Sequence, residues 1–378
     1  MKKLLSLIVL SLFFLSATAE EYRVLVLGDI HYDRKELHTS AKILASKSHR
    51  RNIEMWKKAT PELLARAGKA AKNESVRFVI QLGDITHGYA GTEALQRQLL
   101  TEGYAAVKAY FPETPLLVVR GNHDAGIKSG ADGDAVASEV LTPTVVNAFG
   151  AEKVDADGNC AFRQGDDLFI AINGFLPAKK IVAFVEKTLE ANPDTRYVFF
   201  LTHLPVLPAS ASVPFWLLPG HYRIAELLET RQALILAAHT HVPSVELRVT
   251  QRGMLRQLIV SSMGSQWNPE KLTPPRFTSW DEFVKIGKSR PARKRNQNNS
   301  KRWPVLEAKG TYFFRELFLS SGWVMLHIDD AGYTVEYFTG KDIASYTFRE
   351  ARRPASAAVP AAADIDPQDL SIKTGFKN

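Results

Sequence analysis

Side chains that can bind metal ions recur directly after apolar runs in this sequence. In the clearest case, residues 116–124 read LLVVRGNHD, so a β-branched apolar run ends in an asparagine, a histidine and an aspartate. Carboxylate, amide and imidazole groups without a thiolate form a ligand set suited to Mn, Fe or Zn. We therefore predict a site for two transition-metal ions. The candidate residues are Asp29, His31, Asp84, Asn122, His123, Asp124, His203, His239 and His241.

Five short apolar runs precede these residues, and each has the composition of a buried strand. Alternation of such strands with helices is typical of βαβ units and a mainly parallel sheet, in which ligands bind at the carboxyl ends of the strands. The candidate residues should therefore converge, although Asp29 and His241 stand far apart in the sequence. The runs are 24–27, 78–82, 116–119, 198–201 and 234–237, and the predicted helices are 35–48, 56–73, 92–110 and 180–191.

The pattern changes in the second part of the chain. Residues 126–158 are expected to form a loop around a possible helix, and after Ser244 strands follow one another without helices. We expect these strands to complete a second sheet packed on the first, which gives an α/β fold of two packed mixed β-sheets flanked by helices. The additional predicted strands are 160–163, 168–172, 245–250, 255–262, 324–328 and 333–338.

The polar motifs, in this order, resemble those of the calcineurin-like metallophosphoesterase superfamily over roughly residues 23–241. The helix at 180–191 and the strand after it are similar to the phosphodiesterase-like branch. The resemblance implies a four-layer α/β/β/α sandwich and the hydrolysis of a phosphodiester or phosphomonoester. The matching motifs are Asp29-Ile30-His31, Gly83-Asp84, Gly121-Asn122-His123-Asp124, His203 and His239-Thr240-His241.

The resemblance also implies a role for each candidate residue. Asp29, His31 and His241 would hold one metal ion, Asn122, His203 and His239 would hold the other, and Asp84 would bridge the two. A metal-bridged hydroxide would attack phosphorus in line with the leaving oxygen, and His123 would protonate that oxygen as the general acid. We expect Asp124 to orient His123 by a hydrogen bond.

Other residues near the motifs leave alternatives open. Ala238 stands where the family has glycine, which the site should tolerate if the backbone there has negative φ. His87 follows the bridging aspartate and could be an extra ligand, a substrate contact or a solvated turn residue. Phe215, Trp216 and Trp267 are either walls of the substrate pocket or core residues. Four histidines match no motif and are assigned to the core or surface: His38, His49, His221 and His327.

The first 19 residues predict a signal peptide. Two lysines, an apolar stretch and the small residues Ala17 and Ala19 favour cleavage after Ala19, and a membrane anchor is the alternative. We therefore expect an exported protein, either periplasmic or secreted, with a phosphoesterase domain at 20–350. The single cysteine, Cys160, excludes an internal disulfide and is interpreted as a buried apolar residue.

The 378-residue chain carries a formal net charge of +8, part of which is local. Eight basic residues and no acidic residue fall within 285–302, which predicts either a solvated insertion or an anion-attracting loop. An alternative function follows from this segment: a polyanion-binding or nucleic-acid-binding protein, although the segment lacks the aromatic residues typical of such surfaces. Residues 351–378 are interpreted as a disordered tail. The sequence does not indicate an oligomeric state.

Overall fold

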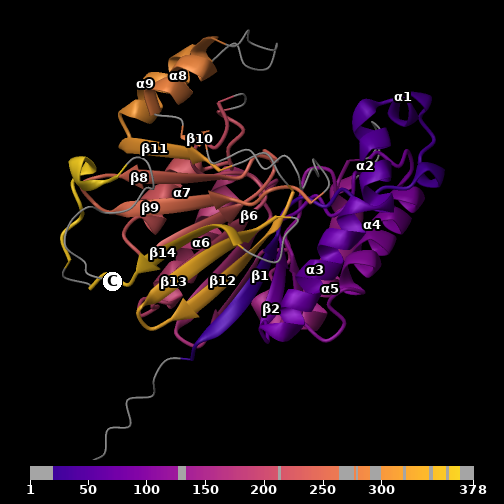
Figure 1. The fold of residues 1–378 in the computed structure, drawn as a ribbon, viewed down its shortest axis with the longest axis horizontal. Helices are drawn as coiled ribbons and strands as arrows, with labels where there is room; N and C mark the ends of the chain where they lie inside the picture. The colour runs from indigo at the N-terminus through magenta and orange to yellow at the C-terminus, as the bar shows by residue number, and fades with distance from the viewer. Residues whose placement is uncertain are drawn as a thin grey trace, which may run out of the picture.

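Two β-sheets pack against each other and helices cover their outer faces (Figure 1). This arrangement confirms the expected α/β fold with two packed mixed sheets. The computed structural model describes residues 20–126, 133–211, 214–263, 276–277, 280–289, 299–317, 321–339, 344–354 and 357–366. The predicted signal peptide therefore lies outside the described residues. Within the described part, no helix combines the length and apolar character that a membrane span requires.

The first sheet has six strands in the order β14-β13-β12-β1-β2-β3. Its parallel half is formed by β1 (Tyr22–Leu27), β2 (Phe78–Gln81) and β3 (Leu116–Val118). Its antiparallel half is formed by β12 (Trp323–Asp329), β13 (Gly332–Phe338) and β14 (Ala344–Ala351). The outer face of this sheet is covered by α3 (Ala59–Asn73), α4 (Glu93–Lys108) and α5 (Gly133–Phe149).

The second sheet has eight strands in the order β10-β11-β8-β9-β7-β6-β5-β4. Strands β5, β6, β7 and β9 run parallel to one another. The strands are β4 (Cys160–Gln164), β5 (Asp167–Ile172), β6 (Val198–Thr202), β7 (Ala233–Ala237), β8 (Ser244–Val249), β9 (Met254–Ile259), β10 (Arg276–Phe277) and β11 (Thr311–Glu316). Its outer face packs on α6 (Ala178–Ala191), α7 (His221–Leu228), α8 (Trp280–Ser289) and α9 (Asn299–Glu307).

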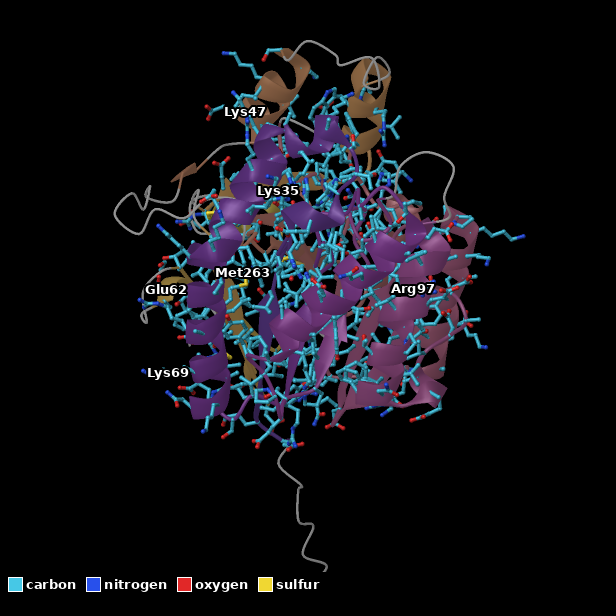
Figure 2. The ribbon with its side chains drawn as sticks, turned by 90° about the vertical axis from the view of Figure 1, so that its right-hand side faces the viewer. Lys35, Lys47, Glu62, Lys69, Arg97 and Met263 are labelled. Carbon is cyan, nitrogen blue, oxygen red and sulfur yellow. The ribbon has the colours of Figure 1, made fainter. Side chains whose placement is uncertain are left out.

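The pleat of each strand explains how one chain builds three apolar layers. In β1, Val24 and Val26 point into the layer between the two sheets, whereas Leu25 and Leu27 point toward the helices. A strand covered on both faces must be apolar throughout, and this is why the central strands read as continuous apolar runs. The helices, in contrast, are polar on the face that is turned away from the sheets. Glu62, Lys69 and Arg97 point away from the protein there (Figure 2).

Several elements differ from the sequence prediction. The expected helix at 35–48 is divided into η1 (Lys35–Leu37), α1 (Ala41–Leu44) and the start of α2 (Lys47–Lys57). The segment 126–158 contains the long helix α5 rather than mainly loop. The strands after Ser244 do not all complete the second sheet, because β12 pairs with β1 and extends the first.

The C-terminal part contains more structure than the insertion predicted at 285–302 and the tail predicted at 351–378. Two helices, α8 and α9, lie beyond β10 and β11 and carry both ends of the basic segment 285–302 (Figure 1). Within the predicted tail 351–378, Ile365 is buried against β8 and β9, while residues 367–378 lie outside the described part. Cys160 is buried in the layer between the sheets, as predicted.

Candidate metal centre

The turns that follow five parallel strands bring the predicted metal ligands together. Asp29 and His31 follow β1, Asp84 follows β2, Asn122 follows β3, His203 follows β6, and His239 and His241 follow β7. Their ligand atoms form two groups, each within 4.8 Å: Asp29, His31, Asp84 and His241 in one, and Asp84, His203 and His239 in the other. Asp84 belongs to both groups, which is the position of a bridging carboxylate.

The separations between these atoms fit coordination of common ions. His31 Nε2 lies 3.0 Å from His241 Nε2, and His203 Nε2 lies 3.1 Å from both His239 Nδ1 and Asn122 Oδ1. His241 Nε2 is 3.3 Å from the Asp29 carboxylate. Ligands bonded at about 2.0–2.2 Å to one tetrahedral ion stand roughly 3.3–3.6 Å apart, so these pairs have separations close to those within one coordination shell.

The surroundings of the candidate ligands orient an imidazole and leave two carboxylates without a lysine or arginine partner within the described part. His203 donates its Nδ1–H to the Leu82 carbonyl at 2.9 Å, which leaves Nε2 to face the other ligands. Asp29 and Asp84 are buried without a lysine or arginine partner among the described residues, and Asp29 Oδ1 accepts no hydrogen bond there. Two buried carboxylates in such surroundings need nearby positive charge, which two cations would supply.

The pKa values of His203 and His239 depend on the charged groups beside them. Burial would lower the pKa of His203, but the charge of Asp84 and its hydrogen bond raise it to about 9. Burial and the neighbouring His203 lower the pKa of His239 to about 3. His239 is therefore neutral and ready to bind a metal ion, whereas His203 must release a proton when an ion binds.

The turns that carry the ligands are tight and tied to one another. His31, Asp84, His239 and His241 have φ of 52°, 53°, 69° and 60°, in the sparsely populated left-handed region. The backbone N–H of His31 donates to the Asp84 carbonyl at 2.9 Å, which joins the β1 and β2 turns. Ala238 is not among the residues with positive φ, so its methyl group adds no backbone strain.

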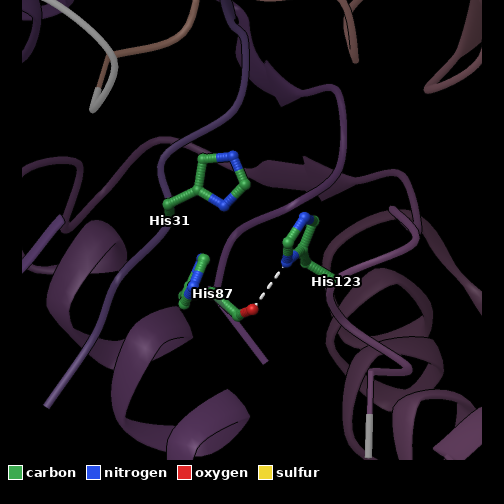
Figure 3. Close-up of side chains that lie close together, drawn as sticks. All are labelled: His31, His87 and His123. Atoms are coloured by element: carbon green, nitrogen blue, oxygen red, sulfur yellow. Dashed lines mark hydrogen bonds between the residues drawn. The ribbon is translucent and has the colours of Figure 1, made fainter. Parts of the chain in front are cut away.

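His123 is held by a different group from the one expected. Its Nδ1–H donates to the backbone carbonyl of His87 at 2.6 Å, and its ring stacks on the His87 ring (Figure 3). Asp124, which we expected to orient His123, instead accepts hydrogen bonds from the backbone N–H groups of Asp84, Gly121 and Thr86 at 2.8–3.1 Å. Asp124 thus holds the β2 and β3 turns together, and the His87 carbonyl fixes the imidazole of His123.

Behind His87 lies a second cluster of titratable side chains, the Asp33 cluster, formed by Asp33, His38 and His49. The two Asp33 oxygens lie 2.6 Å from His38 Nε2 and 2.6 Å from His49 Nδ1. His38 also donates its Nδ1–H to the Tyr89 carbonyl at 3.1 Å. All three side chains are buried, so this cluster fixes the turn that carries His87 and Tyr89.

The Asp33 cluster is joined to His87 through α2. Asn52, one turn after His49 on that helix, donates its side-chain N–H to His87 Nδ1 at 2.8 Å. His87 is therefore a buried residue with a defined tautomer, which excludes the solvated turn residue that the sequence left possible. Sequence reasoning missed Asp33 and Asn52 and assigned His38 and His49 by default. These residues do not recur at a spacing that would indicate a shared site. The one signal in the sequence is that Asp33 stands close to two predicted ligands, Asp29 and His31.

An open cavity of about 840 Å³ lies over the metal ligands. Its lining includes Asp84, Asn122, His123, His239 and His241, together with Thr240, four aromatic residues, two leucines and Arg302. Phe215 and Trp216 both line this cavity, which agrees with the alternative that made them walls of the substrate pocket. Phe215 is also packed in the core beside α9. Trp267 lies outside the described residues.

Comparisons with known proteins agree with this geometry. The Calcineurin-like phosphoesterase family model matches residues 22–243, more than half of the chain. No curated protein matches the sequence. Among solved structures, a dimetal phosphatase from Danio rerio is similar with a TM-score of 0.53 and 11% identity, over 88% of this chain and 99% of that one. The structure of PhoD is similar with a TM-score of 0.53 and 9% identity, over 89% of this chain and 69% of that one.

At these identities the solved structures show a shared fold, whereas the family match covers the segment that carries all seven predicted ligands. The expected family is therefore confirmed independently of the fold. The chain belongs to the calcineurin-like phosphoesterase family and is a metal-dependent phosphoesterase.

Proposed function

We propose that this protein is an exported hydrolase of phosphate esters that uses two transition-metal ions, Mn, Fe or Zn. The observation that carries the proposal is the sharing of Asp84 by the two ligand groups. One ion would be held by Asp29, His31 and His241, and the other by Asn122, His203 and His239. Two bound cations would activate a water molecule as Lewis acids and neutralise charge on the phosphoryl oxygens.

The geometry of His123 supports its role as general acid. Its Nδ1–H is used by the His87 carbonyl, so Nε2 is the nitrogen that can carry a proton to the leaving oxygen. His123 lines the same cavity as the metal ligands Asp84 and Asn122. A phosphate ester bound at the ligands would therefore have its leaving group within reach of this imidazole.

The proposal is tested by chelating the mature protein, adding back Mn, Zn or Fe, and measuring hydrolysis of bis(4-nitrophenyl) phosphate and 4-nitrophenyl phosphate. We expect metal-dependent turnover, and the ratio of the two rates distinguishes a diesterase from a monoesterase. Turnover that persists without metal, or none with two metal ions bound, would contradict the proposed function.

Export is a separate part of the proposal and has its own test. Its support is the charged, apolar and small-residue pattern of residues 1–19. Mass spectrometry of the mature protein should find the N-terminus at Glu20. Retention of residues 1–19 would contradict cleavage and favour the membrane anchor. The polyanion-binding alternative stays a prediction, because residues 290–298 lie outside the described part.

A further inference from the structure

The cavity over the candidate metal ligands is lined by one arginine among the described residues. Arg302, on α9, is the one Lys or Arg among the described residues that line this cavity, and Asp84 is the one acidic residue. Asp84 belongs to the metal centre, so its charge is already matched by the ions proposed there. Within the described part, no carboxylate lies at ion-pairing distance from the Arg302 guanidinium.

Arg302 is held in place by aromatic packing. Its guanidinium lies over the Phe215 ring, 4.4 Å from the centroid, and Phe215 packs edge-on against the buried Trp303. Trp303 contacts Phe283 of α8, so the arginine stands on a cluster formed by two helices and the loop before α7. A guanidinium that lies over a ring keeps N–H groups at its edge for an anion.

Trp216, which follows Phe215 in the chain, lines the same cavity beside the candidate metal ligands. Its side chain is 45% exposed, and its ring centroid lies 5.0 Å from that of His239. Large exposed aromatic side chains in a cavity are typical of ligand contact rather than of core packing. The cavity thus combines candidate metal ligands, an exposed aromatic face beside His239 and a cation that has no carboxylate partner among the described residues.

We propose that Arg302 forms a subsite for a second anionic group of the substrate, a carboxylate or a further phosphate, that is distinct from the phosphate held by the metal ions. The proposal deepens the proposed function and rests on it. The substrate class is then an organic phosphate ester with an apolar or planar portion along Trp216 and an additional negative charge at Arg302.

The test uses binding, so that it does not depend on turnover or on the orientation of the leaving group. Isothermal titration calorimetry of the Mn-loaded protein would compare ω-carboxyalkyl phosphonates of increasing chain length with alkyl phosphonates of the same lengths. At the best length we expect the carboxylate to improve Kd by about tenfold, as for a partly buried charge-assisted contact.

Arg302→Gln should abolish this preference, whereas Arg302→Lys should keep part of it, because lysine retains the charge but not the planar fork. Lys285→Gln on α8 removes the same charge from an exposed position outside the cavity and serves as the matched control, with the preference retained. Manganese content and thermal unfolding of each variant would show that the metal centre and fold are intact.

Four results would overturn the proposal. Equal binding of the carboxyalkyl and alkyl phosphonates by the wild type would show that there is no such subsite. A preference for the carboxyalkyl series that survives in Arg302→Gln would show that Arg302 does not form it. An equal loss in Lys285→Gln assigns the preference to overall charge. If neither series binds the Mn-loaded wild type, the metal centre is not a phosphate site and the proposed function fails as well; binding without the preference removes the Arg302 subsite alone.

Discussion

Two buried groups of histidine and aspartate lie at the same end of this molecule, and they differ in spacing. In the candidate metal centre neighbouring ligand atoms such as His31 Nε2, His241 Nε2 and the carboxylate oxygens of Asp29 and Asp84 are 3.0–3.9 Å apart, and Asp29 Oδ1 has no hydrogen-bond partner among the described residues. In the Asp33 cluster the carboxylate lies 2.6 Å from each of two imidazoles. The first spacing leaves room for an ion, whereas the second is that of direct hydrogen bonds.

The difference shows that residue type alone does not identify a metal site. Both groups combine buried histidines with a buried aspartate, yet both Asp33 oxygens lie at hydrogen-bond distance from an imidazole, whereas Asp29 Oδ1 accepts no hydrogen bond among the described residues. The Asp33 cluster stabilises the turn whose carbonyl orients His123, whereas the candidate metal centre would need bound ions to match the charge of its carboxylates. Four predictions separate these roles, beginning with the largest effect.

Asp84→Asn should have the largest effect on activity, because the amide cannot bridge two cations as a carboxylate does. We expect metal content to fall and hydrolysis of bis(4-nitrophenyl) phosphate to drop by more than about 100-fold. Metal analysis and rate measurements on the same sample check this. Asp166→Asn, at an exposed position, is the control. Normal metal content in Asp84→Asn would remove the bridging role.

His123→Ala should retain both metal ions and lose turnover by roughly 10²–10⁴-fold for esters with poor leaving groups. The loss should be smaller for nitrophenyl esters, because an acidic leaving group needs little protonation. Rates for a series of aryl and alkyl esters would show this dependence on leaving-group pKa. An equal loss across the series would assign His123 to binding rather than to proton transfer.

Asp33→Asn should act on stability rather than on metal content. Removing the carboxylate leaves His38 and His49 buried without their shared partner, at a cost of about 3 kcal/mol in the free energy of unfolding. Urea unfolding of the chelated proteins measures this, and metal analysis should give the wild-type value. A metal content that falls with this substitution would make the Asp33 cluster a metal site.

The smallest expected effect is a pH dependence that involves His38. Burial lowers the pKa of His38, but the hydrogen bond and charge of Asp33 and the Tyr89 carbonyl raise it above its ordinary value. The stabilisation is therefore complete below about pH 6.5, the unfolded pKa, and is lost as pH rises through the raised pKa of the folded state.

The free energies of unfolding of the wild type and His38→Gln, both without metal, would be compared across pH to isolate this contribution. We expect their difference to shrink as pH rises. A difference that grows with pH would mean that His38 is held neutral in the folded protein.

The sequence predicted candidate ligands that the structure brings together, but it did not predict the groups that hold them. Asp29, Asp84 and His203 each follow an apolar run, and such local patterns determine strand ends reliably. The bond from His123 to the His87 carbonyl depends on how two turns pack, which no local pattern encodes. The same applies to Asp33, whose partners are the residue that follows η1 and a residue of α2, and to Arg302, which is placed by helices packed on Phe215.

In the fold, too, the elements with a clear local pattern were predicted, and those that depend on packing were not. Central strands such as β1 and β6 were predicted within a few residues, because burial on both faces makes them apolar throughout. Helix α5 was predicted only as a possible helix within a loop, because the segment is rich in Val and Thr and contains Pro143. Its stability comes from packing on β3 and α4 rather than from intrinsic helix propensity.

The central claim is that the centre around Asp84 binds two metal ions and the Asp33 cluster binds none. Anomalous diffraction from crystals of the protein grown with Mn tests it most directly. We predict two anomalous peaks, one on each side of the Asp84 carboxylate, and no peak between Asp33, His38 and His49. Absence of both peaks at Asp84, or a peak within the Asp33 cluster, would contradict this account.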